Sequence, residues 1–254
     1  MAITIKSERE IELMAEAGKI LERVHNELEK ALRPGMSTKD IDTLGEEIIR
    51  SYGCIPSFLN YNGYPASICV SVNQEVVHGI PDKHRIIQEG DIVSLDAGVI
   101  YKGYHSDAAR THAVGEVSEE AKKLIQVTKE SFFEGIKFAK AGNHLFDISG
   151  AIGRYAEERG YGVVRDLCGH GIGIALHEAP EIPNYEVGRK GVRLRPGMTL
   201  AIEPMINIGT HEVDWLDDDW TVVTRDGSLS AHYENTILIT EGEPRILSLT
   251  CENE

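Results

Sequence analysis

The sequence predicts an α+β protein in which two similar halves, each with two helices followed by strands, share one sheet. Three observations support this prediction. Helical periodicity is followed by β-like patterning twice along the 254 residues, and short motifs recur at a fixed offset between the halves. No Pro/Ser-rich linker separates them, so we expect one domain over residues 1–254, with halves of roughly 1–114 and 115–254.

Two amphipathic helices and three strands make up the first half. Ser7 and Glu10 form a capping box for the first helix, and Ser37 or Thr38 caps the second, which ends at Gly53. Apolar residues at helical spacing form the inner faces: Ile11, Met14, Leu21, Val24 and Leu28, then Ile41, Leu44, Ile48 and Ile49. The β-like segments that follow are residues 68–72, 92–100 and 104–113.

The second half repeats this order. Ser118 caps a helix that ends before Gly142, and a further helix ends at Gly160. Their apolar residues are Leu124, Ile125, Phe132, Phe133 and Ile136, then Ile148, Ile152 and Tyr155. Strands are predicted over residues 198–208, 220–224 and 232–239.

The halves match each other at an offset of 107 residues. Gly35 and Asp40 are separated by the same step as Gly142 and Asp147. Residues 88–96 resemble residues 195–203, which aligns Asp96 with Glu203 at the same offset. Two independent matches at one offset indicate an internal duplication.

Composition excludes several classes of protein. The net charge of −15 disfavours a general binder of nucleic acid or anionic membrane. Neither an apolar signal core at the N-terminus nor a membrane-spanning run is present, and the cysteines at 54, 69, 168 and 251 form no C-x-x-C pair. We therefore expect reduced thiols and a cytoplasmic location. Residues 51–74 carry no charge but are too polar to span a membrane, so they are expected to face a protected surface.

Four carboxylates occupy β-like segments, where acids are normally rare. Asp96, Glu203 and Glu234 each interrupt or begin an apolar run, and each alone is most simply explained as an edge residue or a salt bridge. A hairpin that turns at residues 101 and 102 would place Asp107 directly opposite Asp96. Two like charges on one face of a sheet indicate a divalent ion between them.

His170 lies between glycines, which let a ligand approach the backbone closely, although such a histidine is more often a turn residue. Four carboxylates would balance the charge of two divalent cations, with His170 as a neutral ligand. Oxygen ligands with one imidazole suit Mn²⁺, Fe²⁺ or Co²⁺. A pair of such ions indicates metal-assisted hydrolysis.

The chain resembles the type I methionine aminopeptidases, which are bacterial-type metallopeptidases of the pita-bread fold. The motifs that carry the resemblance span most of the chain: Asn73 to Pro81, Gly90 to Asp96, Gly169 to Gly173, Leu176 to Pro180, Ile202 to Met205 and Tyr233 to Thr236. The resemblance implies a pseudo-twofold antiparallel sheet covered by two pairs of helices. It also implies removal of the initiator methionine from nascent proteins and peptides whose second residue is small; the chain's own Met1-Ala2 start fits this rule.

The resemblance implies roles for individual residues. The metal ligands would be Asp96, Asp107, His170, Glu203 and Glu234, with Asp107 and Glu234 bridging two ions and a bridging hydroxide attacking the methionine carbonyl. Glu203 would also shuttle a proton. His177 would steady the oxyanion, and His78 would contact the scissile amide or the leaving amine. The ions would be cobalt, manganese or iron, with zinc and nickel as further candidates, and some relatives hold a monovalent cation near the equivalents of Asn73 and Ser230.

The resemblance also assigns the methionine pocket to residues Tyr61, Tyr64, Cys69, Leu176 and Trp220, with His78 at its edge. Aromatic and sulfur groups suit a thioether. Two positions depart from many bacterial members: Leu176 replaces an aromatic residue, which would reshape the wall, and Ser94 replaces an asparagine.

Other members of the fold remain as alternatives. Prolidases and aminopeptidases P share the five ligands but usually carry a large extra N-terminal domain, and type II methionine enzymes have a long helical insertion. Some relatives are binding modules that have lost the ligands. We expect a monomer that binds no membrane or specific nucleic acid, and the resemblance leaves transient contact with the ribosome open.

Overall fold

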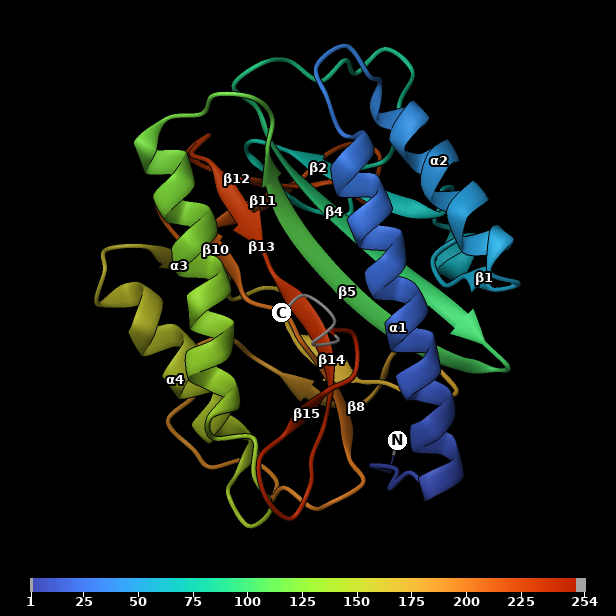
Figure 1. Ribbon diagram of the computed structural model, residues 1–254. Helices are drawn as coiled ribbons and strands as arrows, with labels where there is room; N and C mark the ends of the chain where they lie inside the picture. Colours follow the sequence, from blue (N-terminus) through green and yellow to red (C-terminus); the bar gives the residue numbers. More distant parts are fainter. Residues whose placement is uncertain (1, 250–254) are drawn as a thin grey trace.

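The computed structural model describes residues 2–249, so Met1 and Cys251 lie outside the described range. Two pairs of helices lie on either side of the central strands (Figure 1). The helices are α1 (Glu8–Ala31), α2 (Thr38–Ser51), α3 (Glu119–Ile136) and α4 (Leu145–Glu157). The predicted α+β class is confirmed.

The predicted caps start the first three helices. Ser7 and Glu10 form a capping box at α1, Ser37 caps α2 with Asp40, and the Ser118 hydroxyl accepts a hydrogen bond from the first turn of α3. No helix within residues 2–249 is long and apolar enough to cross a membrane.

A nine-stranded sheet forms the centre of the molecule. Its main path is β1 (Ile55–Pro56), β4 (Ile92–Tyr101), β5 (Tyr104–Ala113), β14 (Glu234–Leu238), β9 (Thr199–Ile202), β7 (Gly169–Gly171) and β8 (Glu178–Ile182); β2 (Ile68–Val72) pairs with β4 and β15 (Arg245–Ile246) with β14. All the pairings are antiparallel, and the β5–β14 pair joins the two halves of the chain. The order β4-β5-β14-β9 is symmetric about that pair, as a duplication would require; the duplication itself stays a prediction.

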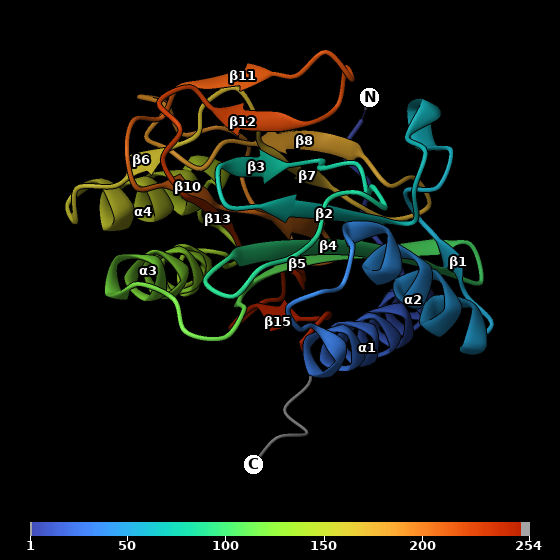
Figure 2. The same ribbon diagram turned by 90° about the horizontal axis from the view of Figure 1, so that it is seen from above.

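Two small sheets complete the architecture. One has the order β13 (Ser230–His232), β10 (Met205–Asn207), β6 (Gly162–Val163), and the other β11 (Val213–Trp215), β12 (Val222–Thr224), β3 (Glu75–Val77). Figure 2 shows α1 and α2 on one face of β4 and β5, and the β11-β12-β3 sheet on the opposite side. Apolar residues of α1 and α2 form one core cluster with β2 and β4, and those of α3 and α4 form another with β9 and β14.

The register of the first hairpin differs from the prediction. Tyr101 pairs with Tyr104, so the turn consists of Lys102 and Gly103, which both have positive φ. A two-residue turn with two positive φ values matches the twist of antiparallel strands. As a result Asp107 pairs with Gly98, and Asp96 lies one step diagonally away on the same face. The predicted direct opposition of the two aspartates is wrong, although they share a face.

Two predicted strands of the second half are broken. Residues 198–208 form β9 and β10, separated at Glu203 and Pro204, and residues 232–239 divide between β13 and β14. Pro204 has no N–H for a sheet ladder. At the first break the chain passes from the nine-stranded sheet to the sheet of β10 and β13, and at the second break it passes back. Glu203 lies at the first of these breaks, and Glu234 follows the second as the first residue of β14.

Candidate active site

One cavity collects all twelve residues that the sequence predicted as divalent-metal ligands, catalytic groups or methionine-pocket residues. These residues are Tyr61, Tyr64, Cys69, His78, Asp96, Asp107, His170, Leu176, His177, Glu203, Trp220 and Glu234. They come from both halves of the chain. Their placement is a finding, whereas their individual roles remain predictions.

Carboxylates form the floor of this cavity. Asp96 projects from β4, Asp107 from β5 and Glu234 from the start of β14. Burial raises the pKa of Asp96 to about 7. Burial also raises the pKa of Asp107, Glu203 and Glu234, and neighbouring carboxylates add to that effect. Over residues 2–249, no Lys or Arg nitrogen lies within 4.0 Å of these four carboxylates.

His170 faces this floor from β7 with its acceptor nitrogen. Burial lowers the pKa of His170 to about 3, so the ring is neutral. Its Nδ1–H donates to the Gly171 carbonyl at 2.9 Å, which fixes the tautomer and leaves a lone pair on Nε2. That atom lies 3.9 Å from Asp107 Oδ2 and 3.6 Å from Glu203 Oε1. The Nε2 lone pair of His170 therefore faces the carboxyl groups of Asp107 and Glu203.

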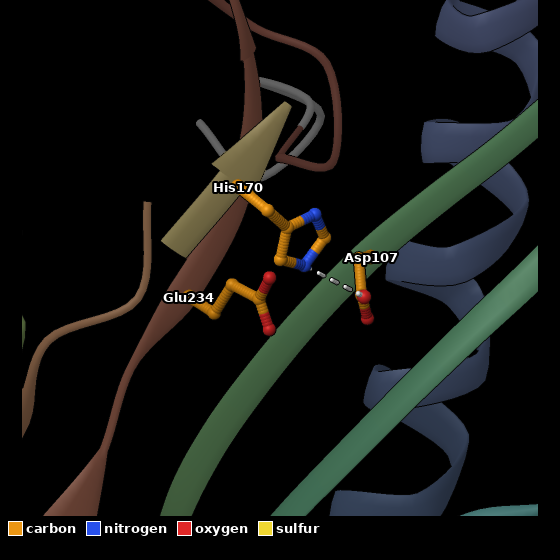
Figure 3. A group of neighbouring side chains, drawn as sticks. All are labelled: Asp107, His170 and Glu234. Atoms are coloured by element: carbon orange, nitrogen blue, oxygen red, sulfur yellow. Dashed lines mark ion pairs between the residues drawn. The ribbon is translucent and has the colours of Figure 1, made fainter. Parts of the chain in front are cut away.

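This donor set fits a bound cation. One ligand atom from each of Asp107, His170 and Glu234 lies within 4.8 Å of the others, and Figure 3 shows the three side chains converging from separate strands. The buried atoms Asp96 Oδ1, Asp107 Oδ1 and Glu234 Oε1 have no hydrogen-bond partner. Buried acceptors without partners are costly, and a divalent ion would satisfy them.

Neutral hydrogen bonds hold the backbone beneath the carboxylates. The Asp107 N–H donates to the Thr236 hydroxyl, which itself donates to the Asp107 carbonyl, so β5 and β14 are locked together. The Asn184 amide donates to the Glu203 carbonyl at 3.0 Å. Ser94 shares a hydrogen bond of 2.8 Å with the Thr111 hydroxyl, so this departure from the family pattern is satisfied locally.

Two further histidines line the cavity above the floor. The Tyr61 hydroxyl lies 3.0 Å from His177 Nδ1, and the His177 ring centre lies 4.1 Å from that of His170. Burial lowers the pKa of His177, and it lowers the pKa of His78 to about 4. His78 lies edge-on to Trp220 at 6.2 Å. Both imidazoles are therefore neutral hydrogen-bonding groups at neutral pH.

An apolar recess lies beside the histidines. Tyr64 packs edge-on against Trp220 at 5.1 Å, and Cys69 and Leu176 are buried in the same cluster. Phe58 and Asn62 also line the cavity, and neither residue was predicted to do so. Their position within the uncharged stretch of residues 51–74 was the available signal.

Comparison with known proteins supports these features. The model of metallopeptidase family M24 matches residues 12–241. A methionine aminopeptidase of Clostridium acetobutylicum is 58% identical over 250 residues, which are 98% of this chain and 100% of that protein. The crystal structure of the Thermotoga maritima methionine aminopeptidase superposes with a TM-score of 0.96 at 47% identity, covering 98% of this chain and 100% of that one. The predicted pita-bread architecture is thereby confirmed.

A more distant structure marks the boundary of this similarity. The Xaa-Pro dipeptidase of Bacillus anthracis is 28% identical with a TM-score of 0.78; the match covers 97% of this chain but only 62% of the dipeptidase. The chain is thus similar to methionine aminopeptidases over their full length and to the dipeptidase over part of it.

Proposed function

The chain belongs to metallopeptidase family M24, and from this premise we propose that it is a methionine aminopeptidase, which removes the initiator methionine from proteins and peptides. One observation carries the proposal: a buried carboxylate–histidine floor adjoins an aromatic and sulfur-lined recess in a single cavity. The floor supplies the means of hydrolysis, and the recess supplies selectivity for methionine.

Five side chains would hold the metal: Asp96, Asp107, His170, Glu203 and Glu234. Four negative charges and one neutral imidazole balance two divalent ions, for which cobalt, manganese and iron are suitable. Such ions supply Lewis-acid polarisation of the substrate carbonyl and lower the pKa of a water molecule. The monovalent cation expected near Asn73 and Ser230 belongs to the same proposal.

The protein's own groups then orient the peptide and move protons. If the Tyr61 hydroxyl donates to His177 Nδ1, the neutral ring keeps its proton on Nε2 and can donate it to the substrate carbonyl oxygen. This hydrogen bond strengthens as charge develops on that oxygen. Glu203, whose pKa is raised by burial, can hold a proton and pass it to the departing amine. His78 lies where it can contact the same amide nitrogen.

The recess selects the first residue of the substrate. Tyr64, Cys69 and Trp220 offer polarisable surfaces to a thioether, and Leu176 adds a branched aliphatic side chain to the same cluster. The free α-amine of the substrate would meet the metal centre, which limits cleavage to the first peptide bond. By the family resemblance, the space beyond that bond is limited, which favours a small second residue. A cytoplasmic location, a monomeric state and contact with the ribosome stay predictions.

The test compares three peptides with the purified protein and added Mn²⁺ or Co²⁺. We expect release of methionine from Met-Ala-Ser, much slower release of leucine from Leu-Ala-Ser, and no cleavage of an X-Pro dipeptide. Metal content measured on the same samples should approach two ions per chain. Cleavage of the X-Pro dipeptide alone would overturn the assignment in favour of prolidase-like activity.

A further inference from the structure

A buried ion pair joins the N-terminal segment to the residue that follows His177. Lys6 Nζ lies 2.6 Å from Glu178 Oε2, and the two side chains are only 5% and 12% exposed. The Thr4 hydroxyl donates to the same oxygen at 2.7 Å. Burial alone would raise the pKa of Glu178, but the hydrogen bonds from Lys6 and Thr4 outweigh it and leave that pKa below its usual value. The carboxylate is therefore charged and paired.

The other oxygen of Glu178 organises the turn before it. Glu178 Oε1 accepts a hydrogen bond of 3.3 Å from the Ala175 N–H. The turn over residues 173–178 carries Leu176 and His177, and is anchored on its far side by the His105 N–H, which donates to the Gly173 carbonyl at 2.8 Å. Glu178 thus connects Lys6 to the backbone that presents His177.

Two glycines make room for this contact. A Cβ at Gly173 would lie 2.5 Å from Lys6 Cε and 2.6 Å from Glu178 Oε1. A Cβ at Gly197 would lie 2.7 Å from an Ile5 methyl, and the Gly197 carbonyl accepts the Lys6 N–H at 2.8 Å. The lysine is therefore fixed at both its backbone and its ammonium group.

We propose that Lys6 and Glu178 are positioning residues, which hold the turn of residues 173–178 so that His177 faces the carboxylate floor. The inference rests on the proposed function, in which His177 binds the scissile carbonyl. A polar group that must meet a developing oxyanion is sensitive to small displacements, and a shift of about 1 Å can cost a hundredfold in rate. Loss of the ion pair should act through His177 and not through the metal ligands.

The variants Lys6→Met and Glu178→Gln remove the charge while nearly preserving size. We expect each to lower kcat for Met-Ala-Ser by roughly tenfold or more, with KM and metal content little changed. In a His177→Ala background, adding Lys6→Met should lower kcat no further. Lys140→Met is the matched control, because Lys140 also pairs with an acid far along the chain, Glu243, but is exposed and does not line the cavity.

Hydrogen exchange measures the same turn without any substrate. Exchange at residues 173–178 should accelerate in Lys6→Met and Glu178→Gln but not in Lys140→Met. Unchanged exchange, a normal kcat with only a lower Tm, or an equal further loss in the His177→Ala background would each overturn the positioning role. Absence of methionine release by the wild-type protein would instead refute the proposed function. The exchange measurement would still test whether the ion pair holds the turn of residues 173–178.

Discussion

Buried charge is handled in opposite ways on the two sides of His177. The Lys6–Glu178 pair is compensated within the chain, with a 2.6 Å contact and a hydroxyl at the same oxygen. The floor of the cavity buries four carboxylates with a neutral histidine and with acceptor atoms that lack partners. A buried charge that is paired within the chain fixes the local structure. A cluster of buried carboxylates without partners is instead stabilised by cations from outside the chain.

The difference gives a physical criterion for recognising the site. Acids are common in this chain, which has 41 of them, and most lie in solvent or in surface ion pairs. In the floor of the cavity, burial, repulsion and missing partners coincide, and the pKa values of all four carboxyl groups rise. Predictions that alter each cluster separately test this criterion.

The largest effect is expected for Asp96→Asn. The change removes one anionic ligand from the floor without altering shape, so metal should be lost. We expect kcat to fall by more than about a hundredfold, since even groups one layer outside a metal site are worth 10–100-fold. Metal analysis of the same preparation is the check, and a full metal complement with normal activity would contradict the ligand assignment.

His177→Ala removes the group that lies between the two clusters. His177 is not one of the five proposed metal ligands, so the metal content of the variant should remain normal. We expect kcat to fall by roughly ten- to a thousandfold through loss of one oxyanion donor. If this variant loses metal instead, the separation between binding of the metal and positioning of the substrate is wrong.

The variant Tyr61→Phe, which changes the hydrogen-bond partner of His177, should show a smaller loss of kcat, because the His177 ring is retained and only its hydrogen bond is removed.

Local sequence signals predicted the elements of the fold well. Ser7, Ser37 and Ser118 cap helices because the hydroxyl oxygen of each accepts a hydrogen bond from a backbone N–H of the first turn. A serine just before residues with helical apolar spacing therefore predicts a helix start. The hairpin strands were placed correctly, but their register was not, because it depends on which two residues of the turn adopt positive φ. A shift of the turn by one residue displaces every pairing across the hairpin.

The sequence predicted which side chains gather in the cavity, but not the residues that hold them in place. Carboxylates within apolar runs are anomalous enough to be noticed, and the family resemblance supplied the remaining residues. The contacts of Asn184 with Glu203 and of Lys6 with Glu178 have no local signal, since each joins residues far apart in the chain. The breaks beside Glu203 and Glu234, where the chain passes between two sheets, are tertiary features as well. Only the packed structure reveals them.

The metal-free protein should have an unusual dependence of stability on pH. Because burial raises the pKa of Asp96 to about 7, the folded chain binds protons that the unfolded chain releases at lower pH. Stability from this group is complete below the unfolded pKa near 4 and is lost as pH rises toward 7. Thermal unfolding of chelator-treated protein should therefore show Tm falling over this range. Excess Mn²⁺ should remove or reverse the trend, and a metal-free Tm that rises over the same range would contradict it.

The smallest expected effect is a change in Tm whose sign differs between the carboxylate floor and the Lys6–Glu178 pair. In metal-free protein at pH 8, Asp107→Asn removes one member of a repelling group, so we expect Tm to rise by roughly 3–6 °C. Glu178→Gln leaves the Lys6 ammonium buried without its carboxylate, so Tm should fall. Added Mn²⁺ should raise Tm of the wild-type protein far more than that of Asp107→Asn, and should raise Tm of Glu178→Gln as much as that of the wild type. Changes of the same sign in the metal-free variants would mean that the floor is compensated internally, and the case for a cation there would fail.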